Sequence, residues 1–219
     1  MDVLIIGAGG HGKVVLDILR SAGLHRPVGF LDAAPGLNGT SVGGLPVLGQ
    51  VNLLPKLKSK ARGAIVAVGD NRARASYCQL LRQEGYELVN ALHPSATISA
   101  AARLGNNVVV AAGAVVGTDS ELADAVIVNT SAIIDHECQI GLSAHICPAA
   151  ALAGRVTVGE LAFVGLGSRV IQCLSLGRQC VIGAGAVVIR DIPDFATAVG
   201  VPARIIKSTA PSPAEPCPV

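Results

Sequence analysis

Most of the candidate chemistry in this sequence lies between Asn129 and Gly141. The stretch reads Asn-Thr-Ser-Ala-Ile-Ile-Asp-His-Glu-Cys-Gln-Ile-Gly, and His145 follows it. A histidine beside a carboxylate makes an effective general base, because the carboxylate stabilises the imidazolium that forms when the histidine takes a proton. His136 and Glu137 are therefore the candidate base and its partner. Adjacent residues on a strand face opposite ways, so this pairing requires a turn; without one, the two residues are a solvated surface pair.

A second candidate site follows a short β-branched run at residues 3–6. The segment from Gly7 to Gly12 reads Gly-Ala-Gly-Gly-His-Gly and fits the pattern G-x-G-x-x-G, with a helical pattern after it. Such glycines let backbone N–H groups at a helix start approach a phosphate. Asp32 lies about 20 residues further on, where an acidic residue holds a ribose hydroxyl in NAD-binding proteins. Taken alone the motif indicates NAD, although it also fits a tight strand-to-helix turn without a ligand.

The surrounding elements predict only about half of a dinucleotide-binding fold. We expect further strands over residues 27–31, 64–68 and 86–89, a helix over 72–84, and a long loop over 35–49 beside the pocket. Gly69, Asp70 and Asn71 follow the third strand as the glycine loop follows the first. Both loops lie at the carboxyl ends of parallel strands, where ligands bind in open α/β sheets. Such a pocket has room for one nucleotide.

The segment from Leu92 to Pro193 repeats every six residues and must position the His136 stretch. Every sixth residue from Leu92 to Val188 is Leu, Ile or Val, a small side chain follows four residues later in nearly every hexad, and glycine often comes directly after the aliphatic residue. A period of six suits short strands joined by tight turns, with three hexads forming one coil of a triangular prism. The sequence therefore predicts a parallel β-solenoid with stacked aliphatic residues inside.

This pattern divides the chain into three segments. We expect an α/β Rossmann-like domain at residues 1–91, the solenoid at 92–207, and a disordered, proline-rich tail at 208–219. Cys138 falls in the small inward slot of the repeat, so we expect its thiol to be buried and not to act as a nucleophile.

Composition argues against several other functions. The 219 residues carry a net charge of +2 with scattered lysines and arginines, which gives no basic patch for nucleic acid. No run of about 18 apolar residues predicts a membrane span. No signal or transit segment precedes the first strand, so we expect a soluble, cytoplasmic protein. The six cysteines contain no C-x-x-C pair and are expected to be reduced and structural.

Four motifs in order resemble the NeuD/PglD family of sugar acetyltransferases, which are hexapeptide-repeat acyltransferases. They are G-A-G-G-H-G, N-T-S-x-I-I-x-H-E-C-x-I-G, H-I-x-P-x-A-x-L-A-G and V-G-V-P-A, and the resemblance runs from about Leu4 to Lys207. It implies that the solenoid is a left-handed parallel β-helix in a homotrimer with active sites between subunits. It also implies acetyl-CoA as co-substrate, no metal, and a nucleotide-linked amino sugar in the N-terminal pocket in place of NAD.

The resemblance also implies a role for individual residues. It implies that His136 is the base and that Glu137 adjusts the proton affinity of His136. The residues implied in acetyl-CoA binding, in the groove between neighbouring subunits, are His145, Gly154, Leu166 and Ala184. The residues implied in binding or approaching the nucleotide sugar are Gly9, Gly10, His11, Asp32 and Gly69. Ala33 stands where the family often has a second acidic residue, so the identity of the nucleotide stays open.

The mechanism that follows is direct acetyl transfer from acetyl-CoA to the amine of a nucleotide-linked 4-amino-4,6-dideoxy sugar, with His136 as base. A sialic acid or other sugar O-acetyltransferase is the nearest alternative, because the sequence does not separate an amine acceptor from a hydroxyl. A zinc carbonic anhydrase on the same solenoid needs three converging histidines, and His93 lies far from the other two along the repeat. A non-catalytic nucleotide-binding scaffold is the remaining alternative.

Overall fold

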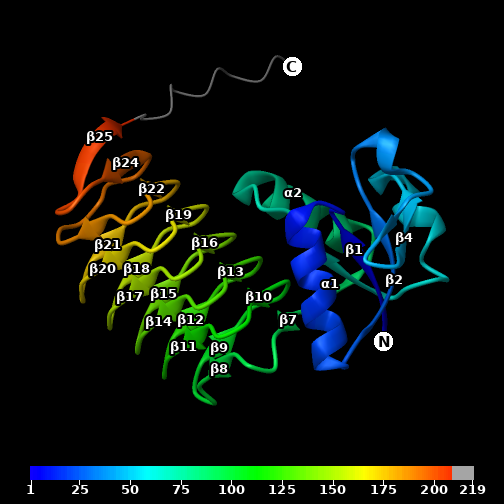
Figure 1. Ribbon diagram of the computed structural model, residues 1–219, viewed down its shortest axis with the longest axis horizontal. Coiled ribbons are helices and arrows are strands. Elements are labelled where there is room, and N and C mark those ends of the chain that lie inside the picture. Colours follow the sequence, from blue (N-terminus) through cyan, green and yellow to red (C-terminus); the bar gives the residue numbers. More distant parts are fainter. Residues whose placement is uncertain (209–219) are drawn as a thin grey trace.

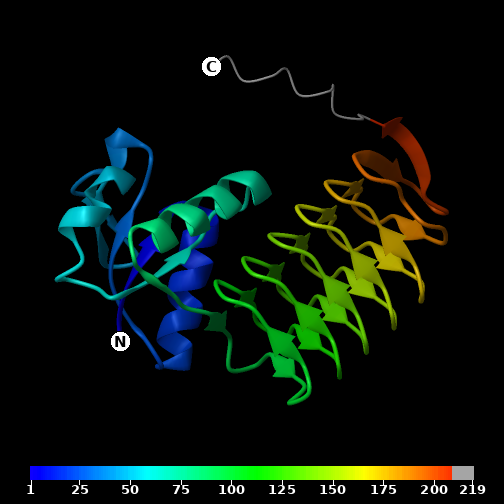
Figure 2. The same cartoon turned by 180° about the vertical axis from the view of Figure 1, so that it is seen from behind.

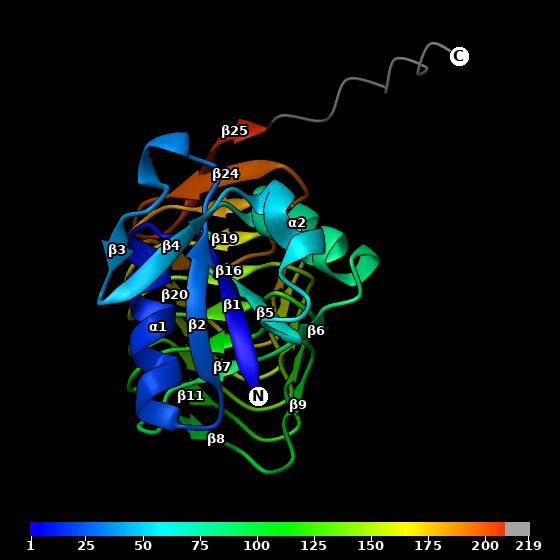
Figure 3. The same cartoon turned by 90° about the vertical axis from the view of Figure 1, so that its right-hand side faces the viewer.

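A computed structural model of the chain describes residues 1–208. An α/β part at the N-terminus lies against one end and one edge of a long prism of stacked coils (Figure 1). Seen from the α/β side, its sheet and two helices cover the first coils (Figure 3). No helix among the described residues is long and apolar enough to cross a membrane.

The α/β part contains a six-stranded sheet in the order β3-β4-β2-β1-β5-β6. All neighbours are parallel except the pair β3 and β4. The strands are β1 (Asp2–Ile6), β2 (Arg26–Leu31), β3 (Ser41–Val42), β4 (Leu45–Gly49), β5 (Gly63–Val66) and β6 (Glu87–Leu88). The helices are α1 (Gly10–Ala22) and α2 (Asn71–Gln83), with short 3-10 helices η1 (Pro35–Leu37) and η2 (Val51–Lys56). The half-fold predicted around the glycine loop is confirmed.

The alternation of β1 explains why the helices lie on opposite faces of this sheet. Val3 and Ile5 pack with α1, whereas Leu4 and Ile6 pack with the cluster that contains α2. The prediction of a long loop over residues 35–49 is wrong, because β4 pairs in parallel with β2 and buries Leu45 and Val47. Gly43 and Gly44 form the turn of the hairpin between β3 and β4.

The solenoid is a left-handed parallel β-helix with three sheets. One sheet continues into the C-terminal hairpin and contains β7 (Ala91–Leu92), β10 (Val109–Val110), β13 (Ile127–Val128), β16 (His145–Ile146), β19 (Phe163–Val164), β22 (Val181–Ile182), β24 (Ala196–Val199) and β25 (Arg204–Ser208). The second contains β8 (Thr97–Ile98), β11 (Val115–Val116), β14 (Ile133–Ile134), β17 (Ala151–Leu152), β20 (Arg169–Val170) and β23 (Val187–Val188). The third contains β9 (Arg103–Leu104), β12 (Glu121–Leu122), β15 (Gln139–Ile140), β18 (Thr157–Val158) and β21 (Ser175–Leu176).

The core of the prism is the predicted stack of aliphatic residues. From Val110 to Val188 each of the sixth-position side chains is buried, and small residues such as Ala132 and Ala150 fill the space between them. The glycines that follow the aliphatic residues allow neighbouring coils to pack closely. Gly117 has an ordinary backbone conformation, but a Cβ there would lie 2.7 Å from the carbonyl carbon of Asp135 in the next coil. Glycine is therefore required at such corners for close approach between coils.

Helix α1 packs on the outward-facing side chains Ala91, Val109 and Ile127, which belong to one face of the first three coils. At the other end of the stack β25 turns back antiparallel to β24. Ser208, which the sequence assigned to the tail, belongs to β25. The rest of the predicted tail, residues 209–219, lies outside the described residues.

Candidate active site

His136 and Glu137 occupy a corner of the prism between β14 and β15. Glu137 has a left-handed backbone with a φ of 58°, and its N–H donates to the carbonyl of Thr118 at 2.8 Å. The N–H of His136 donates to Oδ1 of Asp135, also at 2.8 Å. This turn brings both side chains to the same side, and His136 Nδ1 lies 2.9 Å from Oε2 of Glu137. The pairing predicted from the sequence is confirmed.

The imidazole of His136 lies directly over Gly154, at the same corner of the next coil. A Cβ at position 154 would collide with Nε2 and Cε1 of the ring. The backbone carbonyl of His136 accepts from the N–H of Arg155 at 2.9 Å, which fixes the backbone beneath the ring. No group within residues 1–208 hydrogen-bonds to Nε2, and 44% of the side chain is exposed. With Nδ1 facing the carboxylate, Nε2 is the atom that can take a proton.

Cys138 stands two residues from His136 but faces the core. It is fully buried, and its thiol donates to the carbonyl of Ala153 at 3.3 Å. Burial raises the pKa of this thiol. Cys138 therefore cannot present a thiolate to a substrate at this corner. The cysteines in the described residues, including Cys138, are free of disulfides.

His145 lies far from solvent, at the junction between the solenoid and the α/β part. It starts β16 and is only 8% exposed. Its ring centroid lies 6.5 Å from that of His11 at the start of α1, and Phe163 packs edge-on at 5.4 Å. The structure thus brings together two residues that the sequence had placed in different sites, His11 for the nucleotide sugar and His145 for acetyl-CoA.

Asn129 determines which nitrogen of His145 carries the proton. Its Oδ1 accepts from the N–H of Thr130 at 2.8 Å, so its Nδ2 is the end that faces His145 Nε2 at 3.1 Å. Nε2 therefore accepts this bond, and the proton of a neutral ring lies on Nδ1.

Both junction histidines are neutral at physiological pH. Burial, together with the charge of Arg74, lowers the pKa of His145 to about 3, and the nearby His11 adds to this shift. The same two causes lower the pKa of His11 to about 4. Neither ring has a carboxylate partner among the described residues, so this junction offers neutral hydrogen-bonding groups and not a base paired with an acid.

Asp32 orders the glycine loop. Its Oδ2 accepts from the N–H of Ala8 at 2.7 Å, and its Oδ1 accepts from the N–H of Ala34 at 2.8 Å. Helix α1 begins without a side-chain cap, and the space beside Gly9 and Gly10 is open. The loop therefore leaves unpaired N–H groups facing an accessible space, which suits an anion.

Two pockets adjoin these loops. One of about 250 Å³ lies at the carboxyl ends of β1 and β2, between Asp32, Ala33 and Tyr77, and its size suits one base better than a dinucleotide. The other, of about 450 Å³, lies between the turn from Gly69 to Arg72 and the solenoid residues Phe163 and Val181. The predicted contact residue Gly69 thus lines the junction between the two parts of the chain.

The comparison with known proteins agrees with this geometry. A model of the PglD N-terminal domain matches residues 2–81. The structure of PerB from Caulobacter crescentus, in complex with CoA and GDP-perosamine, is 45% identical, covers 94% of this chain and 98% of that chain, and gives a TM-score of 0.90. This chain belongs to the NeuD/PglD family of sugar acetyltransferases.

Other members and distant relatives agree with that placement in the family. The acetyltransferase domain of PglB from Neisseria gonorrhoeae, in complex with acetyl coenzyme A, is 40% identical over 94% of this chain and 98% of that chain, with a TM-score of 0.90. The serine acetyltransferase of Mycobacterium tuberculosis is 30% identical over 125 residues, which are 57% of this chain and 48% of that protein. The chain spans about half the length or less of the serine acetyltransferases that it matches.

The residues expected to line the acetyl-CoA groove do not lie together within a single copy of this chain. Gly154 lies at the corner between β17 and β18, beneath His136. Leu166 and Ala184 lie at a different edge of the prism, at the corners after β19 and β22, and both are exposed. No cluster of three or more His, Cys, Asp and Glu side chains within residues 1–208 is arranged to hold a metal ion.

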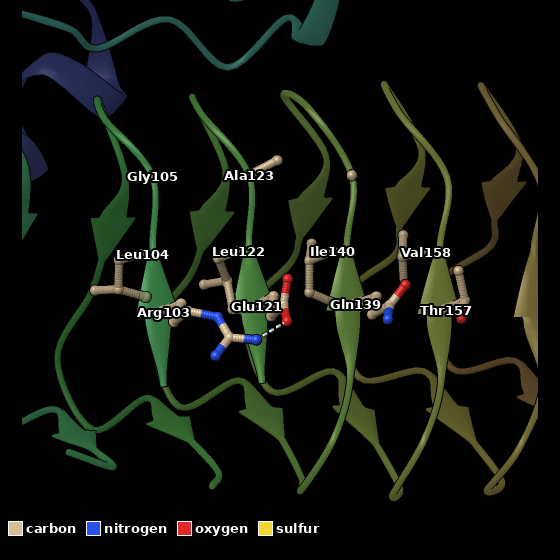
Figure 4. A pocket seen from close by; sticks show the side chains of 11 residues that line it. Arg103, Leu104, Gly105, Glu121, Leu122, Ala123, Gln139, Ile140, Thr157 and Val158 are labelled. Atoms are coloured by element: carbon tan, nitrogen blue, oxygen red, sulfur yellow. Dashed lines mark hydrogen bonds and ion pairs between the residues drawn. The ribbon is translucent and has the colours of Figure 1, made fainter. Parts of the chain in front are cut away.

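A further pocket of about 430 Å³ lies on the third sheet and contains none of the predicted residues. It is an open face of β9, β12, β15 and β18, with Arg103, Glu121, Gln139 and Thr157 pointing outward (Figure 4). Arg103 and Glu121 form an ion pair there. Both side chains are exposed, so this pair contributes little to stability.

Sequence reasoning missed Arg74 and Phe163 at the junction, and it named Asn71 and Asn129 only as members of longer motifs, without a role of their own. Asn71 donates to the carbonyls of Leu161 and Ala162 at 2.9 and 3.0 Å, about 90 residues away in sequence. A signal for Asn129 was present in the motif around His136, but nothing local in the helix pattern distinguished Arg74 from its polar neighbours.

Proposed function

We propose that this chain is an acetyl-CoA-dependent N-acetyltransferase that acts on the amine of a nucleotide-linked 4-amino-4,6-dideoxy sugar. The observation that carries the proposal is the pair His136 and Glu137. The His136 side chain is 44% exposed over Gly154, and its Nε2 has no hydrogen-bond partner within residues 1–208. The relative PerB was crystallised with CoA and GDP-perosamine, and perosamine is a 4-amino-4,6-dideoxy sugar. GDP-perosamine is therefore the first acceptor to test.

The reaction proceeds in one transfer step. The neutral sugar amine attacks the thioester carbonyl of acetyl-CoA, a C–N bond forms, and the C–S bond breaks to release the CoA thiolate. His136 Nε2 takes the proton that the amine loses, and Glu137 stabilises the resulting imidazolium across the 2.9 Å contact at Nδ1. Because Cys138 is buried, no acyl-enzyme is formed on it.

In this proposal residues 1–91 hold the nucleotide sugar and residues 92–207 carry out acetyl transfer. The phosphates bind at the uncapped start of α1, beside Gly9, Gly10 and His11. Asp32 acts by holding the loop in place through Ala8, because both of its carboxylate oxygens already accept backbone N–H groups. Gly69 and its turn face the sugar at the junction.

The proposal includes a homotrimer with shared active sites. His136 and Gly154 lie on one edge of the prism, and Leu166 and Ala184 lie on another, so a groove that uses all four needs a neighbouring copy. The second sheet also presents the apolar side chains Val115 and Ile133 outward, and 44% of Ile133 is exposed. Such a face suits contact between copies. As part of the same proposal, we place the enzyme in the cytoplasm.

Mixed oligomers test the shared groove. His136→Ala and Leu166→Arg each inactivate a different half of the site, so co-assembled oligomers of the two variants contain some intact sites. We expect each pure variant to be nearly inactive and the mixture to recover about a quarter of wild-type activity for random assembly. Mixtures no more active than the pure variants would contradict the sharing of sites between subunits.

An acceptor panel tests the reaction itself. Purified protein is given acetyl-CoA and, in turn, GDP-, UDP- and dTDP-linked 4-amino-4,6-dideoxy sugars and free sialic acid, and thiol release and product mass are recorded. Acetylation of one amino sugar at nitrogen supports the proposal. Acetylation of sialic acid alone would replace it with O-acetyl transfer, and tight nucleotide binding without any transfer would favour a binding scaffold.

A further inference from the structure

Arg74 is a fully buried cation on the helix that joins the two parts of the chain. It lies in the first turn of α2, and its side chain is 0% exposed. Helix α2 runs along an edge of the solenoid (Figure 2). No carboxylate within residues 1–208 forms an ion pair with it. A buried charge without a counter-ion is costly, so its retention requires strong compensation by hydrogen bonds.

The guanidinium of Arg74 is compensated by oxygen atoms from both parts of the chain. On the α/β side it donates to the carbonyls of Val68 and Gly69 at 2.9 and 3.1 Å. On the solenoid side it donates to the carbonyls of Ala125 and Ser143, both at 2.8 Å. The fork of five donors that arginine carries is what allows one side chain to reach all of these acceptors. Burial lowers the pKa of Arg74 to about 10, so it stays charged at neutral pH.

The solenoid acceptors belong to a regular column of corner residues. Its members are left-handed, occur once in each coil and receive a hydrogen bond from the α/β part; they are Asn107, Ala125, Ser143, Leu161 and Gln179. We call these five residues the corner column. Arg74 donates to two of them, Ala125 and Ser143, which precede β13 and β16. Asn71 also bonds to two of them, Leu161 and Ser143.

The turn from Gly69 to Asn71 is fixed by the same contacts. Arg74 donates to Gly69 and, through Nη2 at 2.9 Å, to Oδ1 of Asn71. The hydroxyl of Ser143 donates to the carbonyl of Asn71 at 2.8 Å. This turn lines the junction pocket of about 450 Å³. Its position relative to the solenoid is therefore set by Arg74 together with the direct bonds between Asn71 and the solenoid.

We propose that Arg74 is a positioning residue for acetyl transfer: it holds the Gly69–Asn71 turn at a fixed place on the corner column, so that a bound nucleotide sugar presents its amine to the base in one orientation. This inference rests on the proposed function. A displacement of about 1 Å in such a site can cost roughly a hundredfold in rate. The role concerns acceptor orientation and predicts no change in acetyl-CoA binding.

Arg74→Met and Arg74→Lys test the proposal, with Arg82→Met as the matched control. Arg82 also lies on α2 and bonds to Asp124, the residue before Ala125 at the same corner, but that pair is exposed. We expect Arg74→Met to lower kcat/KM for the nucleotide sugar by about a hundredfold. Lysine keeps the charge and should recover part of this loss, whereas KM for acetyl-CoA should stay within about twofold in every variant and Arg82→Met should match the wild type.

A purely structural role gives a different result. If Arg74→Met only reduces the fraction of folded protein, the loss of kcat disappears when the rate is expressed per folded chain, counted by acetyl-CoA binding, and that outcome would overturn the proposal. So would a folded Arg74→Met enzyme with wild-type kcat/KM. If Arg74→Met does not fold, Ser143→Ala is the fallback variant, because it removes one hydrogen bond to the same turn. A decrease of about threefold in kcat/KM for the nucleotide sugar, with KM for acetyl-CoA unchanged, supports the proposal. An unchanged kcat/KM overturns it.

The test also separates this inference from the proposed function. A wild-type chain that acetylates no nucleotide sugar counts against the proposed function. In that case the positioning role is measured by calorimetry with GDP-perosamine, whose sugar reaches the turn, and with GDP, which lacks the sugar. We expect GDP-perosamine to bind about tenfold more weakly to Arg74→Met than to wild type or Arg82→Met, with GDP affinity little changed. Equal GDP-perosamine affinity in all three proteins would overturn the inference.

Discussion

His136 and His145 are close in sequence and both looked functional, but the fold gives them opposite surroundings. His136 is at a corner, exposed and paired with Glu137, whereas His145 is on a flat strand and covered by His11 and the α/β part. The difference comes from their places in the hexad. His136 is the second residue after the aliphatic Ile134, where the chain turns. His145 directly precedes the aliphatic Ile146 and therefore lies on a strand. A corner position gives a candidate base, and a strand position gives a neutral junction residue.

Apart from removal of His136 itself, the largest effect on this comparison should come from Gly154→Ala. The added methyl group collides with the far end of the His136 side chain, so the ring must swing away from its place. We expect kcat to fall by about a hundredfold with little change in melting temperature, because general base catalysis contributes roughly 10² to 10⁴ and depends on geometry. Gly36→Ala is the control, since a Cβ there meets nothing within 4 Å. Wild-type kcat in Gly154→Ala would show that the ring position is unimportant.

Glu137→Gln should have a smaller effect. The amide keeps the size and a hydrogen bond to Nδ1 but removes the negative charge that stabilises the imidazolium. We expect kcat to fall about tenfold while both KM values stay near wild type. Steady-state kinetics with each substrate varied in turn checks this. An unchanged kcat would mean that Glu137 only orients the ring.

The junction histidines should make stability depend on pH. The pKa values of about 3 for His145 and about 4 for His11 lie below the ordinary 6.5. Below about pH 6.5 the unfolded chain binds these protons and the folded chain does not, so stability is complete above that pH and decreases as the pH falls towards 4. Each histidine contributes a slope of up to about 1.4 kcal/mol per pH unit.

Urea unfolding at pH 7, 6 and 5, at one protein concentration, measures this slope. In His145→Gln one of the two groups is absent, so the fall in the free energy of unfolding should be shallower by up to about 1.4 kcal/mol per pH unit. Identical slopes for wild type and variant would mean that His145 titrates alike in the folded and unfolded chains.

The smallest expected effect belongs to Cys138→Ala. Removing a buried sulfur leaves a small cavity and should lower the free energy of unfolding by about 1 kcal/mol. Because the thiol faces the core, we expect kcat to stay within about twofold of wild type, and an acetyl-transfer assay checks this. A loss as large as that expected for Gly154→Ala would point to an acyl-enzyme on Cys138.

The solenoid could be predicted almost completely because its order is local. Each aliphatic residue, such as Ile134 or Leu152, packs on the equivalent residue one coil away, so a strict period of six sets strands, register and core together. The pair His136 and Glu137 was equally predictable, because both partners lie on one turn. The left-handed φ of 58° at Glu137 is the kind of detail that only the stacked coils impose.

The junction could not be predicted, because its contacts are long-range. Arg74 lies in a polar helix and looks solvent-exposed in the sequence, yet its acceptor in Ser143 is 69 residues away. Strand β4 was missed for the same reason: the segment is rich in Gly and Pro, and only pairing with β2 makes it a strand. Sequence pattern shows that His145 faces outward from the prism, but not that the α/β part covers it.

Single-turnover acetyl transfer by His136→Ala and His145→Ala, at saturating acetyl-CoA and nucleotide amino sugar, tests the contrast between the two histidines most directly. If the corner histidine is the base and the junction histidine a neutral positioning group, His136→Ala should be about a thousandfold slower than wild type, and His145→Ala should remain within about tenfold. The opposite order, or equal losses, would contradict the assignment of the base to the exposed corner.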